Sequence, residues 1–156
     1  MKMKIYLIII PLITVTVALS GSLITDRGMD WYNQIKLPVW TPSGEIIGIA
    51  WTLIFIFTTY SAMLFWNRGF RNKRFWAVIV LFLLNGALNA LWSFLFFGLH
   101  YVGASILEMI ILEITTIALV VLIRPTSRLA SILLYPYAIW VAFATYLAYS
   151  VLILNM

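Results

Sequence analysis

Apolar residues along this chain fall into five long runs that are separated by short polar segments. The runs cover approximately residues 5–25, 46–67, 75–99, 101–123 and 129–154. A membrane-spanning helix needs about 20 mostly apolar residues, and in lipid only helices and closed barrels satisfy every backbone polar group. Because the runs do not alternate polar and apolar positions, they predict helices and not barrel strands. We therefore expect an all-α integral membrane bundle of five transmembrane helices, forming a single domain over residues 1–156.

The composition supports lipid as the solvent for most of the chain. Of the 156 residues, 64% are hydrophobic and 10% are charged, whereas a soluble domain is about 45–50% apolar and about 25% charged. A chain of this length cannot bury so much apolar surface in its own core. The sequence contains no cysteine, which excludes disulfides, thiolate metal sites and cysteine nucleophiles.

The first run also resembles a secretory signal peptide, because it follows Lys2 and Lys4 and ends near small residues. The apolar core of a signal peptide is about 7–15 residues long, and this run is longer. We therefore expect residues 5–25 to remain as the first spanning helix.

Positive charges are distributed unevenly between the two sides of the predicted bundle. The N-terminal side carries eight: Lys2, Lys4, Arg68, Arg71, Lys73, Arg74, Arg124 and Arg128. The other side carries only Arg27 and Lys36. The positive-inside rule therefore places the N-terminus in the cytoplasm and the C-terminus outside, with residues 26–45 as an outer loop. Because the basic residues follow from topology and lack a nucleic-acid-binding fold around them, we expect no nucleic-acid partner.

Polar residues inside the spans are candidates for function. Asn85 and Asn89 are four residues apart and share a helix face, which Trp92 joins three residues later. Asparagine side chains also bridge helices, so a structural role and a ligand contact both stay open. Glu108 and Glu113 lie in the fourth run, where a carboxylate is costly and suggests function by default. Their spacing separates them by about 140°, so we expect one to face the bundle and the other a partner subunit or water.

Residues that an enzyme or a metal site would need are sparse. The single histidine, His100, lies in a short turn, and a solvated position suits it better than the role of a lone metal or haem ligand. The sequence shows no Ser-His-Asp set, phosphate loop or paired-carboxylate motif. We therefore expect no metal site, and the sequence shows no conventional catalytic site.

Three of the seven tryptophans lie deeper than an interfacial belt explains. Trp51 is about 9 Å from the outer side of the second run, and Trp92 approaches to about 10 Å from the same side in the third. Trp140 is near the middle of the fifth run, four residues after Pro136, which can kink the helix. Helix packing is one explanation. An aromatic pocket for a flat apolar ligand, in the outer half of the bundle, is the other.

Four motifs resemble, in the same order, those of the TspO/MBR family, which comprises tryptophan-rich sensory proteins and translocator proteins, including the peripheral benzodiazepine receptor. They are "WYNQIKLPVWTPS", "GIAWTLIF", "LNALWSFLFFG" and "YPYAIWVAFATYL", and the resemblance covers nearly the whole chain. There are three departures. The family's Lys-Pro pair is Leu37-Pro38, with Lys36 one position earlier; its Pro-Pro pair is Pro42-Ser43; and the asparagine after the last motif is Ala148.

The resemblance implies a five-helix bundle, commonly a homodimer, whose outer half holds a pocket closed by the first loop. It implies tetrapyrrole ligands such as protoporphyrin IX and haem, with sterols and isoquinoline or benzodiazepine-type compounds as other ligands and no required cofactor. The implied pocket residues are Trp51, Phe55, Asn89, Trp92, Trp140, Phe143 and Ala144, with Tyr32, Trp40 and Pro42 in the loop. Because no Lys or Arg follows the tyrosines near the C-terminus, we predict no sterol motif, a weak pattern in any case.

Three functions are compatible with the sequence. A receptor or carrier would stack tetrapyrroles on indoles, contact their polar edge with Asn89, and pair their propionates with Arg27 or Lys36. Alternatively, Trp51 and Trp140 would act as redox-active residues in a light- and oxygen-dependent breakdown of porphyrins. The third possibility is an accessory membrane protein that dimerises through small residues such as Gly44/Gly48, Gly86/Ala90 and Ala138/Ala142. Prolines stiffen the loop, which favours a lid over a plain membrane anchor.

Overall fold

The computed structural model describes residues 5–156, which are helical apart from short connections. Its elements are α1 (Tyr6–Tyr32), α2 (Gly44–Arg68), α3 (Lys73–Ser93), the π-helical turn η1 (Phe94–Gly98), α4 (Val102–Ile123), α5 (Arg128–Ile132) and α6 (Tyr135–Leu154). Five segments are long and apolar enough to cross a membrane, with α3 and η1 forming one segment and α5 and α6 another. The predicted all-α fold with five transmembrane helices is confirmed.

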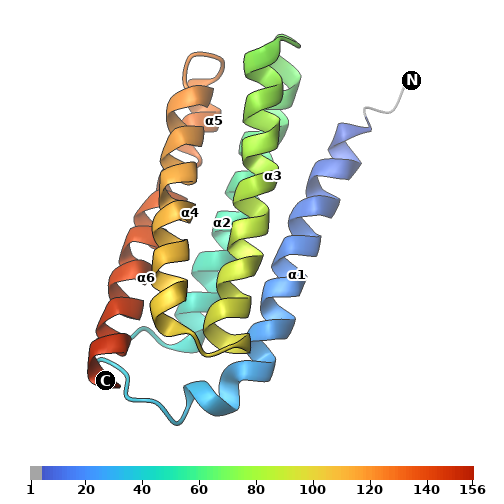
Figure 1. Cartoon of the computed structure of the whole chain (residues 1–156). Coiled ribbons are helices and arrows are strands. Elements are labelled where there is room, and N and C mark those ends of the chain that lie inside the picture. The colour runs from blue at the N-terminus through green and yellow to red at the C-terminus, as the bar shows by residue number, and fades with distance from the viewer. Residues whose placement is uncertain (1–4) are drawn as a thin grey trace.

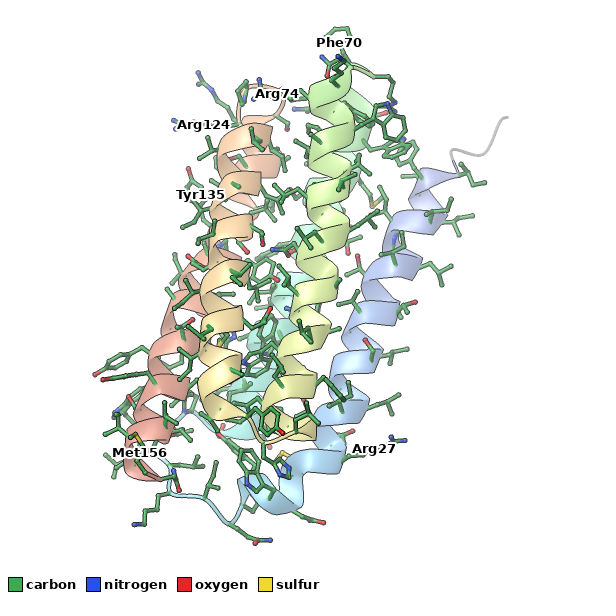
Figure 2. The ribbon with its side chains drawn as sticks, viewed as in Figure 1. Arg27, Phe70, Arg74, Arg124, Tyr135 and Met156 are labelled. Carbon is green, nitrogen blue, oxygen red and sulfur yellow. The ribbon has the colours of Figure 1, made fainter. Side chains whose placement is uncertain are left out.

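The spanning segments run alternately up and down, which places the start of α1 and the end of α6 at opposite ends of the bundle (Figure 1). Packing contacts close the segments into a ring in which α1 touches α2 and α3, α4 touches α3 and α6, and α2 touches α5 and α6. Figure 2 shows Phe70, Arg74 and Arg124 at one end and Arg27 and Met156 at the other. We call these the basic end and the long-loop end.

Polar side chains cap the helices where the apolar runs begin. Ser43 accepts a hydrogen bond from the Ile46 amide at the start of α2, and Asn72 accepts one from the Phe75 amide at the start of α3. Ser127 caps α5 in the same way. Such caps satisfy amides that have no partner within the helix, and they fix these helix starts close to the predicted boundaries.

The predicted loop over residues 26–45 is too long, because α1 continues to Tyr32 and leaves only residues 33–43 as the connection. The apolar run ends at Thr25, but Asp26, Arg27 and Asp30 continue the helix. A hydrophobic run marks the part of a helix that lies in lipid, whereas charged residues are compatible with helix beyond it. Lys2 and Lys4, which contributed to the predicted orientation, lie outside the described residues.

The fifth apolar run consists of two helices. The α-helical pattern breaks at Leu133 and Leu134, and Pro136 lies in the first turn of α6. Proline lacks an amide hydrogen and fits the first turn of a helix better than its interior. The irregularity that Pro136 predicted is therefore present, as a helix break just before the proline.

The two ends of the bundle differ in their packing. At the basic end Phe65 and Phe75 stack with ring centroids 5.3 Å apart, in a cluster that includes Leu119, Ile123 and Leu134. Two further clusters, around Phe96 and Phe97 and around Ile54 and Tyr137, occupy the other half. Their half-buried aromatic neighbours include Tyr32, Trp51, Trp92 and Trp140, which line a cavity.

Candidate ligand-binding site

A cavity of about 610 Å³ lies in the half of the bundle next to the long-loop end. Residues of α1, α2, α3, η1 and α6 form its wall. The volume is within the range of about 300–1,000 Å³ that is typical of small-molecule sites. The lining includes all seven pocket residues that were expected on the helices: Trp51, Phe55, Asn89, Trp92, Trp140, Phe143 and Ala144.

Trp51 connects the aromatic residues of the wall. Its ring centroid lies 6.3 Å from that of Trp92, at an interplanar angle of 30°, and 5.8 Å from that of Phe55. Trp92 in turn stacks on Phe96 at 5.6 Å. Packing of this kind fixes ring orientations, so the cavity has flat, rigid walls.

The wall also contains polar groups of two kinds. The Asn89 side-chain amide donates a hydrogen bond to the Tyr137 hydroxyl at 3.1 Å, which joins α3 to α6. In contrast, the Nε1 atoms of Trp92 and Trp140 are buried and have no hydrogen-bond partner within residues 5–156. A buried donor without an acceptor costs about 1–3 kcal/mol. Both indoles line the cavity, but neither Nε1 atom has accessible surface on it, so these N–H groups are not open to a ligand in this structure.

The expected loop residues divide into two groups. Tyr32, at the end of α1, lines the cavity, whereas Trp40 and Pro42 are not among its lining residues. Trp40 instead stacks on Tyr146 of α6 at 5.5 Å and meets Phe143 edge-on at 5.9 Å. Trp40 therefore packs against Phe143, a residue of the cavity wall, without lining the cavity itself.

Asn155 fastens the loop to the end of α6. Its side-chain oxygen accepts from the Lys36 amide at 2.9 Å, and its side-chain nitrogen donates to the Lys36 carbonyl at 2.9 Å. This pair of hydrogen bonds was not predicted, because a single asparagine near the C-terminus gives no signal for it in the sequence.

Apart from Tyr32, which was expected in the loop, the contribution of α1 to the cavity was not predicted. Its lining residues are Ala18, Leu19, Gly21, Ser22, Thr25, Asp26, Met29 and Tyr32. The only charged side chain among all lining residues is Asp26. The cations expected at the mouth, Arg27 and Lys36, are not among these residues. The one signal in the sequence was the recurrence of small and polar residues, Ser22 and Thr25, on one side of the first run.

The other polar residues that the sequence marked as candidates, Asn85, Glu108 and Glu113, are not among the lining residues of the cavity. Asn85 donates to the hydroxyls of Thr115 and Thr116 at 2.8 and 3.0 Å, which joins α3 to α4 and gives Asn85 the structural role. Glu108 is buried, and neither carboxylate oxygen has a hydrogen-bond partner within residues 5–156. Glu113 is half-buried. The two acids thus differ in burial, and neither is a lining residue.

His100 lies in the exposed turn after η1 and adopts a positive φ of 60°. Its ring stacks on Trp31 with centroids 4.2 Å apart. Within residues 5–156, no group of three or more His, Asp or Glu side chains could hold a metal ion. The cavity, with its aromatic wall, can enclose a flat molecule and stack on it.

These features define a class: a multi-pass membrane protein with an aromatic-walled cavity inside one half of a five-helix bundle. The profile of the TspO/MBR family matches residues 8–154, and the chain belongs to that family.

Relatives from different organisms match over most of their length. The tryptophan-rich protein TspO of Bacillus cereus is 33% identical over 156 residues, which cover 99% of this chain and 100% of the relative. The translocator protein of Homo sapiens is 34% identical over 129 residues, covering 80% of this chain and 75% of that protein. An uncharacterized membrane protein of Bacillus subtilis, YtaB, is 37% identical over 129 residues and 81% of each chain.

Proposed function

We propose that the protein is a membrane receptor or carrier that binds tetrapyrroles, such as protoporphyrin IX and haem, or flat apolar molecules of similar size. The observation that carries this proposal is the cavity of about 610 Å³ with Trp51, Trp92 and Trp140 in its wall. Indole faces stack favourably on flat conjugated rings. The names of the relatives, tryptophan-rich protein TspO and translocator protein, are in line with a receptor or carrier.

The aromatic faces of the wall narrow the class of ligand. Trp51, Trp92 and Trp140 line the cavity and favour a ligand with a flat conjugated body, because indole faces stack on such rings. A tetrapyrrole has a body of this kind. Sterols lack the conjugated face and fit this wall less well.

The test is an absorbance titration of protoporphyrin IX with the protein in nanodiscs. Loss of two indole faces in Trp51→Phe plus Trp140→Phe should weaken binding about ten-fold, equivalent to about 1.4 kcal/mol. Trp76→Phe is the matched control, because Trp76 is 51% exposed and lies at the basic end. Equal affinities of the double variant and the control would refute the proposed site. Failure of the wild-type protein to bind, with a dimer present, would favour the accessory role instead.

A second candidate function is the light- and oxygen-dependent breakdown of a bound porphyrin. It is favoured by the position of Trp51 and Trp140 on the same cavity, where both indoles would contact an excited ligand and serve as the redox-active residues. The test is illumination in air of the porphyrin complex. A new absorbing product with the wild type, absent with the double variant, would support breakdown, and identical bleaching by both would exclude it.

We infer that the basic end faces the cytoplasm, so that the cavity lies in the outer half of the membrane. Among the described residues, six Lys and Arg are at the basic end: Arg68, Arg71, Lys73, Arg74, Arg124 and Arg128. Arg27 and Lys36 are at the other end, and such a bias sets orientation.

We also infer a homodimer. Its interface does not use Gly86, because a Cβ on this residue would lie 3.4 Å from Val17 of the same chain.

A further inference from the structure

We propose that the ligand enters and leaves the cavity sideways from the lipid bilayer, through an opening between α1 and α2. This inference rests on the proposed binding function and adds the source of the ligand: a molecule dissolved in the membrane. The opening is defined by six residues that line the cavity and are also exposed at the surface. They are Leu19, Ser22 and Asp26 on α1 and Gly44, Gly48 and Thr52 on α2.

The exposure of the lining residues places this opening on one side of the bundle. Every exposed residue in the wall belongs to α1 or α2, whereas the lining residues of α3, η1 and α6 are buried or half-buried. The three residues on each helix are spaced by three or four positions, so each set forms one stripe. From Gly44 to Thr52 the opening extends about 12 Å along the helix axis, and Leu19, at 58% exposure, lies well inside an apolar span. Such a length reaches from the membrane surface into the hydrocarbon.

Glycines show that α1 packs closely on one side only. A Cβ on Gly28 would lie 2.5 Å from the Phe97 carbonyl oxygen, and one on Gly21 would lie 3.3 Å from the Ser93 hydroxyl, so α1 is tightly packed against α3 and η1. A Cβ on Gly44 or Gly48 would meet no atom within 4 Å among the described residues. The gap between α1 and α2 is therefore open along this stripe.

At the basic end the same two helices are tied together. Tyr6 stacks on Trp66 with centroids 6.2 Å apart, and its hydroxyl donates to the Asn67 side chain at 3.1 Å. The opening is thus confined to the half of the bundle that contains the cavity.

The route from the aqueous side is blocked by packed groups. The loop is held at Lys36 by the two hydrogen bonds of Asn155, and Trp40 is stacked on Tyr146. Tyr32 packs on Phe97 with centroids 5.5 Å apart. Entry from water would have to break these contacts, whereas entry between α1 and α2 requires only that small side chains and Leu19 give way. The lateral route is therefore the one that the packing favours.

A reversible block tests the route. The chain has no native cysteine, so Gly48→Cys can be modified by a bulky alkyl methanethiosulfonate after folding and restored by a reductant. Gly103→Cys is the matched control, because Gly103 is exposed in α4 and a Cβ there would meet no atom within 4 Å among the described residues. Association and dissociation of protoporphyrin IX are then followed by stopped-flow absorbance in nanodiscs.

With the label on Gly48→Cys, we expect both rate constants to fall by about ten-fold or more, as for binding that requires a conformational change, and to recover on reduction. The labelled Gly103→Cys protein should keep the wild-type rates. Unchanged rates, or a slower association with no slower dissociation, would overturn the lateral route, because the label would then be inert or occupy the site. The variant Asn155→Ala gives an independent test. If release of the loop speeds the association and dissociation of protoporphyrin IX, the ligand enters from water and the proposal is overturned. If the wild type binds no porphyrin, the proposed function fails together with the route. If it binds porphyrin at rates that the label does not change, only the lateral route fails.

Discussion

Replacement of Gly28 by alanine tests whether close contact with η1 fixes the position of α1. The added Cβ would lie 2.5 Å from the carbonyl oxygen and 2.7 Å from the Cβ of Phe97. Both atoms are held by the backbone of η1, so rotation of a side chain cannot relieve the overlap. The two helices would have to separate, and the α1 side of the cavity would move with them.

The magnitude follows from two opposing terms. Overpacking of this kind costs about 1–3 kcal/mol, while replacement of a helical glycine by alanine gains about 1 kcal/mol from helix propensity. Gly28→Ala should therefore lower the free energy of unfolding by about 0–2 kcal/mol. Gly48→Ala is the matched control, because its Cβ would meet no atom within 4 Å among the described residues. It should raise the free energy of unfolding by about 0.5–1 kcal/mol.

The difference between the two variants, about 1–3 kcal/mol, is more informative than either value because propensity largely cancels. The assay is reversible unfolding in mixed micelles, followed by circular dichroism, with the porphyrin affinity of each variant measured in parallel. If both substitutions stabilise the protein equally, the contact between Gly28 and Phe97 does not position α1.

Three further predictions concern single side chains. Asn85→Leu should lower the free energy of unfolding by only about 1 kcal/mol, because Thr115 and its neighbour still donate to a backbone carbonyl; a loss above about 3 kcal/mol in the same unfolding assay would contradict this. Asp26→Asn should strengthen binding of a dianionic porphyrin by less than about five-fold, because a like charge is removed, and the gain should be smaller at high salt. Titrations at two salt concentrations measure this, and weaker binding by the variant would show that the carboxylate assists the ligand. Asn155→Ala should speed hydrogen exchange at the Lys36 amide, measured by mass spectrometry, and leave helix amides protected; an unchanged rate at Lys36 would show that Asn155 does not hold the loop.

The sequence predicted the five spans for physical reasons, and its three deep indoles lie on one cavity. Hydropathy over about 20 residues is a strong signal in lipid, and the depth of an indole follows from its distance along a helix. Trp51, Trp92 and Trp140 therefore came together at the expected level, and the cavity wall contains them all.

Other features could not be predicted in this way. Small residues such as Ser22 and Thr25 look alike in a sequence whether they face lipid, a neighbouring helix or a cavity, so the α1 wall was missed. The clamp on the loop joins Lys36 and Asn155, which are 119 positions apart, and neither residue is unusual alone. The end of α1 was misplaced because hydropathy reports the edge of the membrane and not the end of the helix.

The position of the cavity follows from the sizes of the side chains that face each other across α1 and α2. At the basic end the pair meets through Tyr6 and Trp66, which fill the space between the helices. Towards the long-loop end the lining residues include Ser22 on α1 and Gly44 and Gly48 on α2, and a Cβ on either glycine would meet no atom within 4 Å among the described residues. Voids of this kind lower stability because their lining loses contacts, so a cavity in an otherwise packed bundle is a cost that function would explain. The same small residues that create the space also leave it open to the membrane, and this links the proposed binding site to its proposed route of access.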